Sequence, residues 1–300
     1  MLHGTGPTAK PALASAPGGA GGGLAKRIAS AGVLGGLALV AVAAGGFTFA
    51  GFVAAIALVV GWEWGRIVRS RAGDLSFGLH AAASLVAIGA AALARPGLAL
   101  VIIVVMAGLL TVMNYGRGGR LSGAGVLYTG LPAVILLTMR HSEAYGFFAV
   151  LFILLVVWSA DTAAYAGGRA VGGAKLWPSI SPNKTWAGLV SALGASLVMG
   201  VALQAAWPLA PLGHLPLVAV LLGLSSQAGD LAESALKRLF KVKDASNLIP
   251  GHGGFLDRVD SVVAAAIVAA VIGLALAPDD PARGLVTGAG AVAEGIVAAL

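Results

Sequence analysis

The residues from Ser234 to Asp260 are the part of this chain best equipped for chemistry. They hold five cations, three carboxylates and the glycine-rich run Pro250-Gly-His-Gly-Gly254, although only 10% of the chain is charged. Unobstructed backbone N–H groups and basic side chains both bind phosphate oxygens. We therefore expect a polyphosphate-binding loop. Attraction of its cations to anionic lipid headgroups is the alternative, and the interleaved aspartates argue against it. The cations are Lys237, Arg238, Lys241, Lys243 and Arg258.

Carboxylates precede this loop on one helix face. Asp230, Glu233 and Ser234 fall at i, i+3 and i+4 of an apolar run, and Lys237 continues the same stripe. A solvated helix end would explain Lys237, but it explains Asp230 poorly because that residue lies deeper in the run. We therefore expect this face to line a polar site.

Asp257 and Asp260 repeat the i, i+3 spacing at the start of the next apolar run. If the two runs pack as antiparallel helices, Asp257 returns beside Asp230 and the pair can clamp one metal ion. Carboxylates in a low dielectric repel each other unless a cation lies between them, and oxygen ligands without cysteine suit Mg²⁺ or Mn²⁺. The alternative is a pair of acids favoured only by the helix macrodipole.

Two other polar groups stand out upstream. The stretch from Ser179 to Trp186 predicts a helix start with Ser181 at the N-cap, where Lys184 and Thr185 would bind a phosphate. An ordinary capped helix with a loop lysine is the alternative. Asp161 lies inside an apolar run, where a charge costs about 2.5 to 3.5 kcal/mol on insertion scales, so it either faces a polar site or pairs with Arg169.

Composition places these groups in a membrane protein. The chain is 58% hydrophobic and has no cysteine, which excludes a disulfide framework and a Cys-based metal site. Runs of about 18 or more apolar residues can cross a bilayer as helices. We expect an all-α, polytopic transmembrane bundle of about nine spans, with the catalytic site at the cytoplasmic ends of the C-terminal helices. The expected spans are 28–46, 48–65, 77–94, 97–114, 123–139, 145–166, 186–207, 214–236 and 260–277.

The positions of the cations predict the orientation. With a cytoplasmic N-terminus, sixteen of the nineteen Lys and Arg residues lie on the cytoplasmic side of these spans. This positive-inside pattern predicts that the loops after the sixth and eighth spans are cytoplasmic, and it explains the net charge without nucleic acid. We expect four segments, which are a disordered tail over 1–24, N-terminal helices over 25–120, a catalytic transmembrane domain over 121–283, and an apolar segment over 284–300 that is interfacial, reentrant or a tenth span.

These residues resemble the phosphatidate cytidylyltransferase, or CDP-diglyceride synthase, family. The family signature is matched at every specified position by Ser234-Ala-Leu-Lys-Arg, then Lys243-Asp-Ala-Ser, then Ile249-Pro-Gly-His-Gly-Gly-Phe-Leu-Asp-Arg-Val-Asp260. The resemblance continues upstream through Gly229 to Glu233, Ser181 to Thr185 and Asp161 to Tyr165, so it covers roughly the C-terminal half. Ala187 departs from it, because family members often carry a polar residue there.

The resemblance implies condensation of phosphatidate with CTP to give CDP-diacylglycerol and pyrophosphate. It also implies a divalent metal at Asp230 and Asp257, K⁺ as a second cation in some relatives, and a homodimer in the bacterial inner membrane. Spacing adds Glu233 and Asp260 to the expected metal ligands. The expected catalytic residues are Asp161, Asp230, Lys237 and Asp257. The expected substrate-binding residues are Ser181, Lys184, Thr185, Ser234, Arg238, Lys243, Asp244, His252, Gly253, Gly254 and Arg258.

Two other functions are alternatives. A CTP-dependent lipid-alcohol kinase would use similar residues but would transfer the γ-phosphoryl group and release CDP. A secondary transporter would place its charges near the middle of broken helices in related halves. The crowding of charge at the cytoplasmic ends of the spans argues against a transporter.

Overall fold

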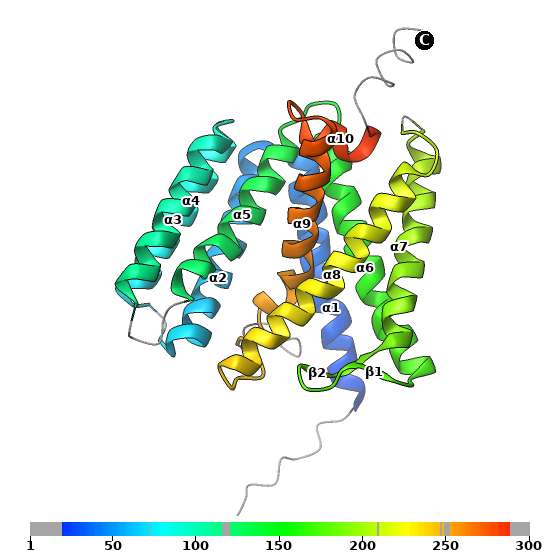
Figure 1. Ribbon diagram of the computed structural model, residues 1–300, viewed down its shortest axis with the longest axis horizontal. Coiled ribbons are helices and arrows are strands. Elements are labelled where there is room, and N and C mark those ends of the chain that lie inside the picture. The colour runs from blue at the N-terminus through cyan, green and yellow to red at the C-terminus, as the bar shows by residue number, and fades with distance from the viewer. Residues whose placement is uncertain are drawn as a thin grey trace, which may run out of the picture.

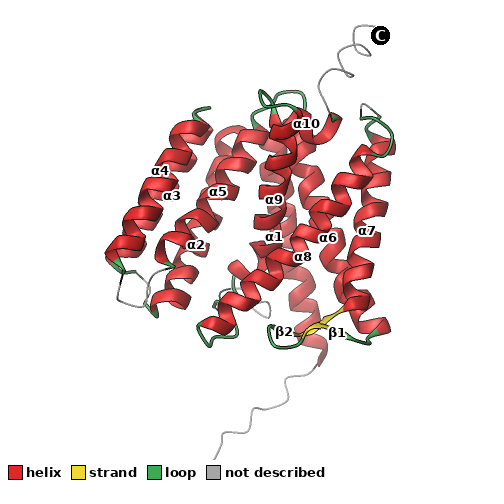
Figure 2. Cartoon of the chain, viewed as in Figure 1, coloured by secondary structure: helices red, strands yellow, loops and turns green. Residues whose placement is uncertain are grey.

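The computed structural model describes residues 20–71, 73–115, 121–208, 210–246, 248 and 253–288, and these are almost entirely helical (Figures 1 and 2). The all-α prediction is confirmed. The helices are α1 (Ala20–Ala44), α2 (Gly46–Arg69), α3 (Leu75–Ala92), α4 (Pro96–Met113), α5 (Ser122–Arg140), α6 (Gly146–Val171), α7 (Trp186–Ala206), α8 (His214–Leu239), α9 (Leu256–Leu276) and α10 (Pro281–Thr287).

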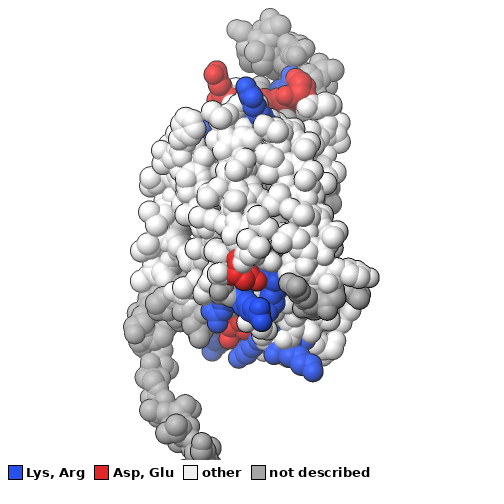
Figure 3. Space-filling model, turned by 90° about the vertical axis from the view of Figure 1, so that its left-hand side faces the viewer, with Lys and Arg blue, Asp and Glu red and all other residues white. Residues whose placement is uncertain are grey.

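Each predicted span corresponds to one helix from α1 to α9. In the described part of the chain, α2 to α9 are long and apolar enough to cross a membrane, while the apolar stretch of α1 from Ala29 to Ala44 is shorter. Figure 3 shows charged side chains near both ends of one face, with a broad uncharged band between them. This distribution is the one expected for a bundle whose middle lies in hydrocarbon.

The ends of the chain differ from the prediction or lie outside the description. Helix α1 begins at Ala20, inside the segment predicted to be a tail, and residues 1–19 lie outside the described residues. The predicted 284–300 segment begins within α10, a helix of seven residues, and its remainder from 289 onward also lies outside. The described helix α10 is too short to span a bilayer.

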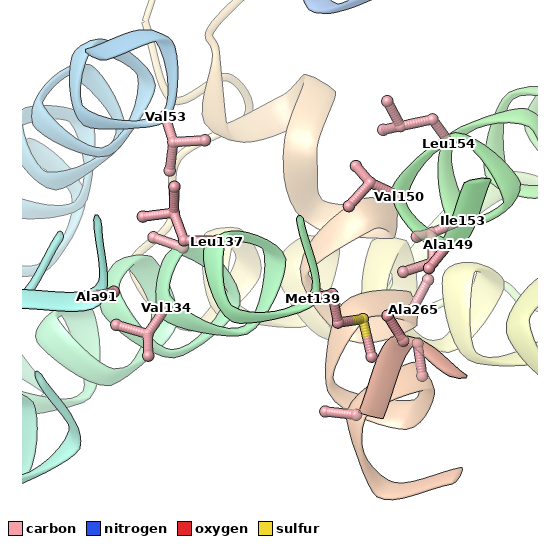
Figure 4. Packing of buried hydrophobic residues seen from close by; sticks show 14 of the residues in the cluster. Val53, Ala91, Val134, Leu137, Met139, Ala149, Val150, Ile153, Leu154 and Ala265 are labelled. Carbon is pink, nitrogen blue, oxygen red and sulfur yellow. The ribbon is translucent and has the colours of Figure 1, made fainter. Parts of the chain in front are cut away.

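The helices pack as two groups, α2 to α5 and α6 to α8, and contacts between α5 and α9 connect them. Helices α2 to α5 contact one another, α7 packs against both α6 and α8, and α9 contacts α8 as well as α5 (Figure 1). Figure 4 shows Leu137 of α5 pointing toward Val53 of α2, with Met139 of α5 close to Ala265 of α9. The continuous core couples the C-terminal helices to the N-terminal ones.

The prediction of a helix start at Ser181 is wrong. Strand β1 (Lys175–Trp177) pairs antiparallel with β2 (Ser181–Thr185), so these residues are extended. Helix α7 starts at Trp186, and Thr185 is its N-cap, where the hydroxyl accepts from the amide of Gly188 at 3.0 Å. Ser181 and Thr185 are both good capping residues, and pairing with β1 selects the later one. The hairpin lies at the same end of the bundle as the α8–α9 connection (Figure 1).

Candidate active site

Helices α8 and α9 are the scaffold of the site. They run antiparallel and pack against each other, as predicted (Figure 1). They approach each other closely at Gly229, where an added Cβ would lie 2.6 Å from the backbone oxygen of Asp260. A glycine at this position therefore brings the acids of α8 next to those of α9.

Lys237 joins the two helices. Its ammonium group lies 2.7 Å from Glu233 on α8 and 2.6 Å from Asp257 on α9. Asp257 also accepts from the amide of Gly254 at 2.9 Å. Glu233 is 3% exposed and its Oε1 has no hydrogen-bond partner among the described residues, so this half of the carboxylate remains available to a ligand.

Lys184 brings the hairpin into the same site. Its ammonium group lies 2.9 Å from the carboxylate of Asp230 and donates to the carbonyl of Gln227 at 3.2 Å. The hydroxyl of Ser234 is 3.5 Å from Asp230, which is at the limit of a hydrogen bond. The predicted second anion site is therefore adjacent to the acids, but its lysine is presented by a strand and not by a helix N-terminus.

Asp161 of α6 faces the same cluster. It accepts from the side-chain amide of Gln227 at 3.0 Å and from the hydroxyl of Ser261 at 3.3 Å. Arg169, the alternative partner, instead donates to the hydroxyl of Tyr165 at 3.0 Å. Asp161 is therefore held by polar groups of α8 and α9, as expected of a residue that faces a polar site.

The described acids outnumber the lysines that contact them. Asp260 is 6% exposed, and Asp161, Asp230 and Glu233 are near enough to interact with its charge. With Asp257, five carboxylates share two ammonium groups, those of Lys184 and Lys237. Of the predicted metal ligands, Asp230 pairs with Lys184 and Asp257 pairs with Lys237. The cluster carries a formal excess of three negative charges.

The charged residues of the predicted phosphate loop are mostly exposed. Arg238 is exposed and donates to the carbonyl of Ile180 in the hairpin at 3.2 Å. Lys243, Asp244 and Arg258 are also exposed. Gly253 has a φ of +82°, which favours glycine. His252 lies outside the described residues, so its predicted role stays a prediction.

An apolar cavity of about 650 Å³ lies beside the acids. Its apolar walls come from α1, α2, α5, α6 and α9, and include Val53, Leu136, Leu154 and Val262. Asp161 and Arg258 belong to its lining, and Asp161 is itself one of the five carboxylates. The cavity therefore joins a hydrocarbon-like space to a charged site.

Two buried residues that hold the site were missing from the prediction. Glu63 of α2 is 0% exposed and bonds to the start of α9, while Gln227 of α8 connects Lys184 with Asp161. A carboxylate inside the predicted 48–65 span was a usable signal for Glu63, because ionisable groups in spans are costly. Gln227 gave no comparable signal, since a single amide three residues before Asp230 is unremarkable.

The donor chemistry fits a hard divalent cation. All the acidic side chains of the cluster are carboxylates, and their formal charge exceeds that of the two lysines. Among the described residues, Oε1 of Glu233 has no hydrogen-bond partner. No three carboxylates or histidines of the described residues converge at metal-binding distances. The metal site therefore stays a prediction, with Asp230, Glu233, Asp257 and Asp260 as the residues that would hold the ion.

Known proteins resemble most of the chain. The model of the Cytidylyltransferase family matches residues 25–276. A Phosphatidate cytidylyltransferase of Brucella suis is 42% identical over 262 residues, which are 86% of this chain and 96% of that protein. A Phosphatidate cytidylyltransferase of Bacillus subtilis is 42% identical over 137 residues, 45% of this chain and 51% of that protein. Similarity thus extends well beyond the C-terminal half, and the chain belongs to the cytidylyltransferase family.

Proposed function

We propose that this chain is an integral membrane phosphatidate cytidylyltransferase. It condenses phosphatidate with CTP and releases CDP-diacylglycerol and pyrophosphate. The relatives named above carry this activity in their names, and the family match covers the helices that build the site. The observation that carries the proposal is the placement of the acid and lysine cluster beside the apolar cavity.

The cavity suits the diacylglycerol part of phosphatidate. Its walls are apolar, as acyl chains require, while Arg258 lies in the same lining and can donate two parallel hydrogen bonds to a phosphate. A lipid seated there would bring its phosphate toward Lys184 and Asp161. Burial of the acyl chains would thus position the reacting phosphate oxygen of phosphatidate, and this positioning would not depend on contacts with CTP.

A triphosphate requires extra positive charge at this site. Five carboxylates and two lysines leave an excess of negative charge, which would repel CTP. Asp230, Glu233, Asp257 and Asp260 would hold Mg²⁺ or Mn²⁺, which would supply positive charge to offset that of the phosphates. K⁺ as a second cation would reduce the same repulsion. Removal of divalent cations with EDTA should abolish turnover, and Mg²⁺ should restore it.

The reaction is a substitution at the α-phosphorus of CTP. A phosphomonoester has its second pKa near about 6, so the phosphate of phosphatidate is already largely dianionic at neutral pH and needs no strong general base. Its oxygen forms a bond to the α-phosphorus while the bond to the β-phosphate bridging oxygen breaks, and pyrophosphate leaves with that electron pair. The protein contributes charge neutralisation and alignment.

We assign different basic residues to the different phosphate groups of the substrates. Lys184, presented by β2, is placed to hold one phosphate against Asp230, and Lys237 is placed to stabilise charge near Asp257. Arg238 and Lys243 are exposed cations of the loop that follows α8, and we assign them to the departing pyrophosphate. Ser181, Thr185 and Gly254 shape the surrounding backbone.

One assay tests the proposal. Purified protein is mixed with CTP labelled in the cytosine ring, Mg²⁺, and either phosphatidate or a lipid alcohol, and lipid-soluble label, pyrophosphate and CDP are measured in both mixtures. In the mixture with phosphatidate, we expect equal amounts of lipid-soluble label and pyrophosphate. Release of CDP with phosphorylation of a lipid alcohol would instead identify the kinase, and no product from either lipid would contradict the proposal.

The proposal includes location and assembly. We place the cluster on the cytoplasmic side of the inner membrane, because the cations gather there by the positive-inside rule and CTP is a cytoplasmic substrate. We also propose a homodimer. Helices α4 and α7 are the least buried of the described candidate spans, with 22% of each apolar window buried, so they offer faces for a second copy.

A further inference from the structure

Glu63 connects the N-terminal helices to the signature loop. It lies on α2, is 0% exposed, and its Oε2 accepts from the amide of Leu256 at 2.6 Å. Its Oε1 accepts from the amide of Phe255 at 3.0 Å and from the hydroxyl of Ser246. One carboxylate therefore receives three hydrogen bonds from a segment more than 180 positions away in the chain.

Helix α9 needs such a partner. The first amides of a helix have no acceptor within the helix, and the N-cap residue of α9, Phe255, supplies no side-chain acceptor. Glu63 supplies both acceptor oxygens, and its negative charge faces the positive end of the helix dipole. No ion pair of the described residues involves Glu63, and its hydrogen-bond donors among those residues are the amides of Phe255 and Leu256 and the hydroxyl of Ser246.

The adjoining glycine is explained by the same contact. A Cβ added to Gly254 would lie 2.6 Å from Oε1 of Glu63. The amide of Gly254 donates to Asp257, which in turn pairs with Lys237. An unbroken path of contacts therefore leads from Glu63 through the backbone of residues 254–256 to the proposed active site.

We infer that Glu63 is a positioning residue for this reaction. It fixes the start of α9 and so sets where Asp257 and Asp260 lie relative to the acids of α8. Glu63 acts through the backbone of residues 254–256 and not on the substrates. The inference rests on the proposed function, because the acids it positions are those assigned to the transfer step.

Glu63→Gln is the sharpest test. The amide keeps the shape of the side chain, but its nitrogen cannot accept a hydrogen bond, so one of the two acceptor positions is lost. Small misplacements of catalytic groups cost up to about 100-fold in rate, and we expect kcat to fall about 10- to 100-fold while KM for CTP and phosphatidate stays within about twofold.

Amide hydrogen exchange measures how well the start of α9 is held, and it does not require turnover. The amides of residues 254–257 should exchange faster in Glu63→Gln than in wild type, while those of α3 and α4 should not change. This readout separates failure of the inference from failure of the proposed function. A wild-type chain without cytidylyltransferase activity would leave the exchange result intact.

Two further variants provide controls. Ser76→Ala removes another buried hydrogen bond of the N-terminal half, the one to Asn114 at 3.2 Å. When its thermal stability equals that of Glu63→Gln, Ser76→Ala should still have the kcat of the wild type. Ser246→Ala removes only the hydroxyl donor to Glu63 and should give a smaller fall in kcat. The effects of Ser246→Ala and Glu63→Gln should not add, because both act on one carboxylate.

Two results would overturn the inference. One is a Glu63→Gln enzyme with kcat and exchange rates equal to wild type. The other is a loss of activity that follows loss of thermal stability equally in Glu63→Gln and Ser76→Ala, because that pattern would mean a purely structural role. If Glu63→Gln does not fold, Glu63→Asp takes its place beside Ser246→Ala. Additive effects of those two substitutions on kcat would then overturn the inference, and non-additive effects would support it.

Discussion

At the scale of single residues, each lysine of the site holds two acceptors. Lys237 contacts Glu233 and Asp257, and Lys184 contacts Asp230 and the carbonyl of Gln227. Such pairs neutralise part of the buried negative charge, and removal of one partner leaves the other uncompensated. Substitutions in the two pairs should therefore have different effects on turnover and on binding.

Asp257→Asn should abolish cytidylyl transfer. The substitution removes a proposed metal-binding charge but leaves Glu233 to hold Lys237, so the protein should still insert and remain folded. CDP-diacylglycerol formation is measured in membranes, with protein amount and thermal stability checked in parallel. Near-normal turnover would contradict the assignment of Asp257 as a metal ligand.

Lys184→Ala should weaken binding of a phosphate. A hydrogen bond to a charged group contributes about 1.5 to 3 kcal/mol, which corresponds to a rise in KM of roughly 10- to 100-fold for the substrate whose phosphate it holds. Initial rates are measured against CTP and phosphatidate in turn. Arg71→Ala is the control, because it removes one cation from the connection that follows α2 and lies outside the proposed site. It should leave both KM values unchanged. Equal KM values in Lys184→Ala and wild type would rule out this role.

Sequence patterns located these residues better than they located their partners. The i, i+3 and i+4 spacings correctly placed Asp230, Glu233 and Lys237 on one face, because helix geometry is local. Pairing of Lys184 with Asp230 depends on the hairpin, and contact of Glu63 with α9 depends on packing of α2 against the other half. Neither can be obtained from local spacing.

At the scale of elements, the helices were predictable and the hairpin was not. Long apolar runs specify helices in a membrane because their backbone must be satisfied internally. Strands of three and five residues have too few positions to show alternation, and β2 is stabilised only by pairing with β1. Local capping rules then favoured Ser181 over Thr185, the residue that caps α7 in the structure.

The connection between α2 and α3 predicts a pH-dependent contribution to stability. Asp74 is the N-cap of α3 and pairs with Arg69 at 3.1 Å. Partial burial raises the pKa of Asp74, but hydrogen bonds from Arg69 and from the amide of Phe77, with the charges of Arg69 and Arg71, outweigh it and hold the pKa below its ordinary value. The ionised form therefore stabilises the fold above the unfolded pKa of about 3.9, and this contribution is lost as the pH falls through the lower folded pKa.

Asp74→Asn should keep the cap but lose the ion pair. We expect a loss of up to about 1 kcal/mol at neutral pH and a smaller loss in acid, because the wild-type carboxylate is then protonated as well. The free energy of unfolding in detergent is compared at pH 7 and below pH 4. Asp279→Asn, which removes an exposed pair with Arg283, is the control. A difference between variant and wild type that is equal at both pH values would contradict the expectation.

At the scale of the whole molecule, the charge pattern and the packing agree. The loops predicted to be cytoplasmic after the sixth and eighth spans lie at one end of the bundle, where α8 ends and α9 begins (Figure 1). The positions of the long helices could be predicted from hydropathy, but convergence of α2, α6, α8 and α9 on one site could not. Convergence depends on close contacts such as Gly229 against Asp260, which sequence periodicity does not reveal.

The orientation can be tested because the chain contains no cysteine, so a single introduced thiol is the only site for a maleimide. Leu212 precedes α8 and Leu239 ends it, and both are exposed, by 99% and 68%. They form a matched pair at opposite ends of one span.

In intact spheroplasts, a membrane-impermeant maleimide should label Leu212→Cys but not Leu239→Cys, and Trp177→Cys in β1 should behave like Leu239→Cys. Permeabilisation should expose all three thiols. Labelling of Leu239→Cys in intact spheroplasts would place the carboxylates outside, away from CTP, and would overturn the orientation.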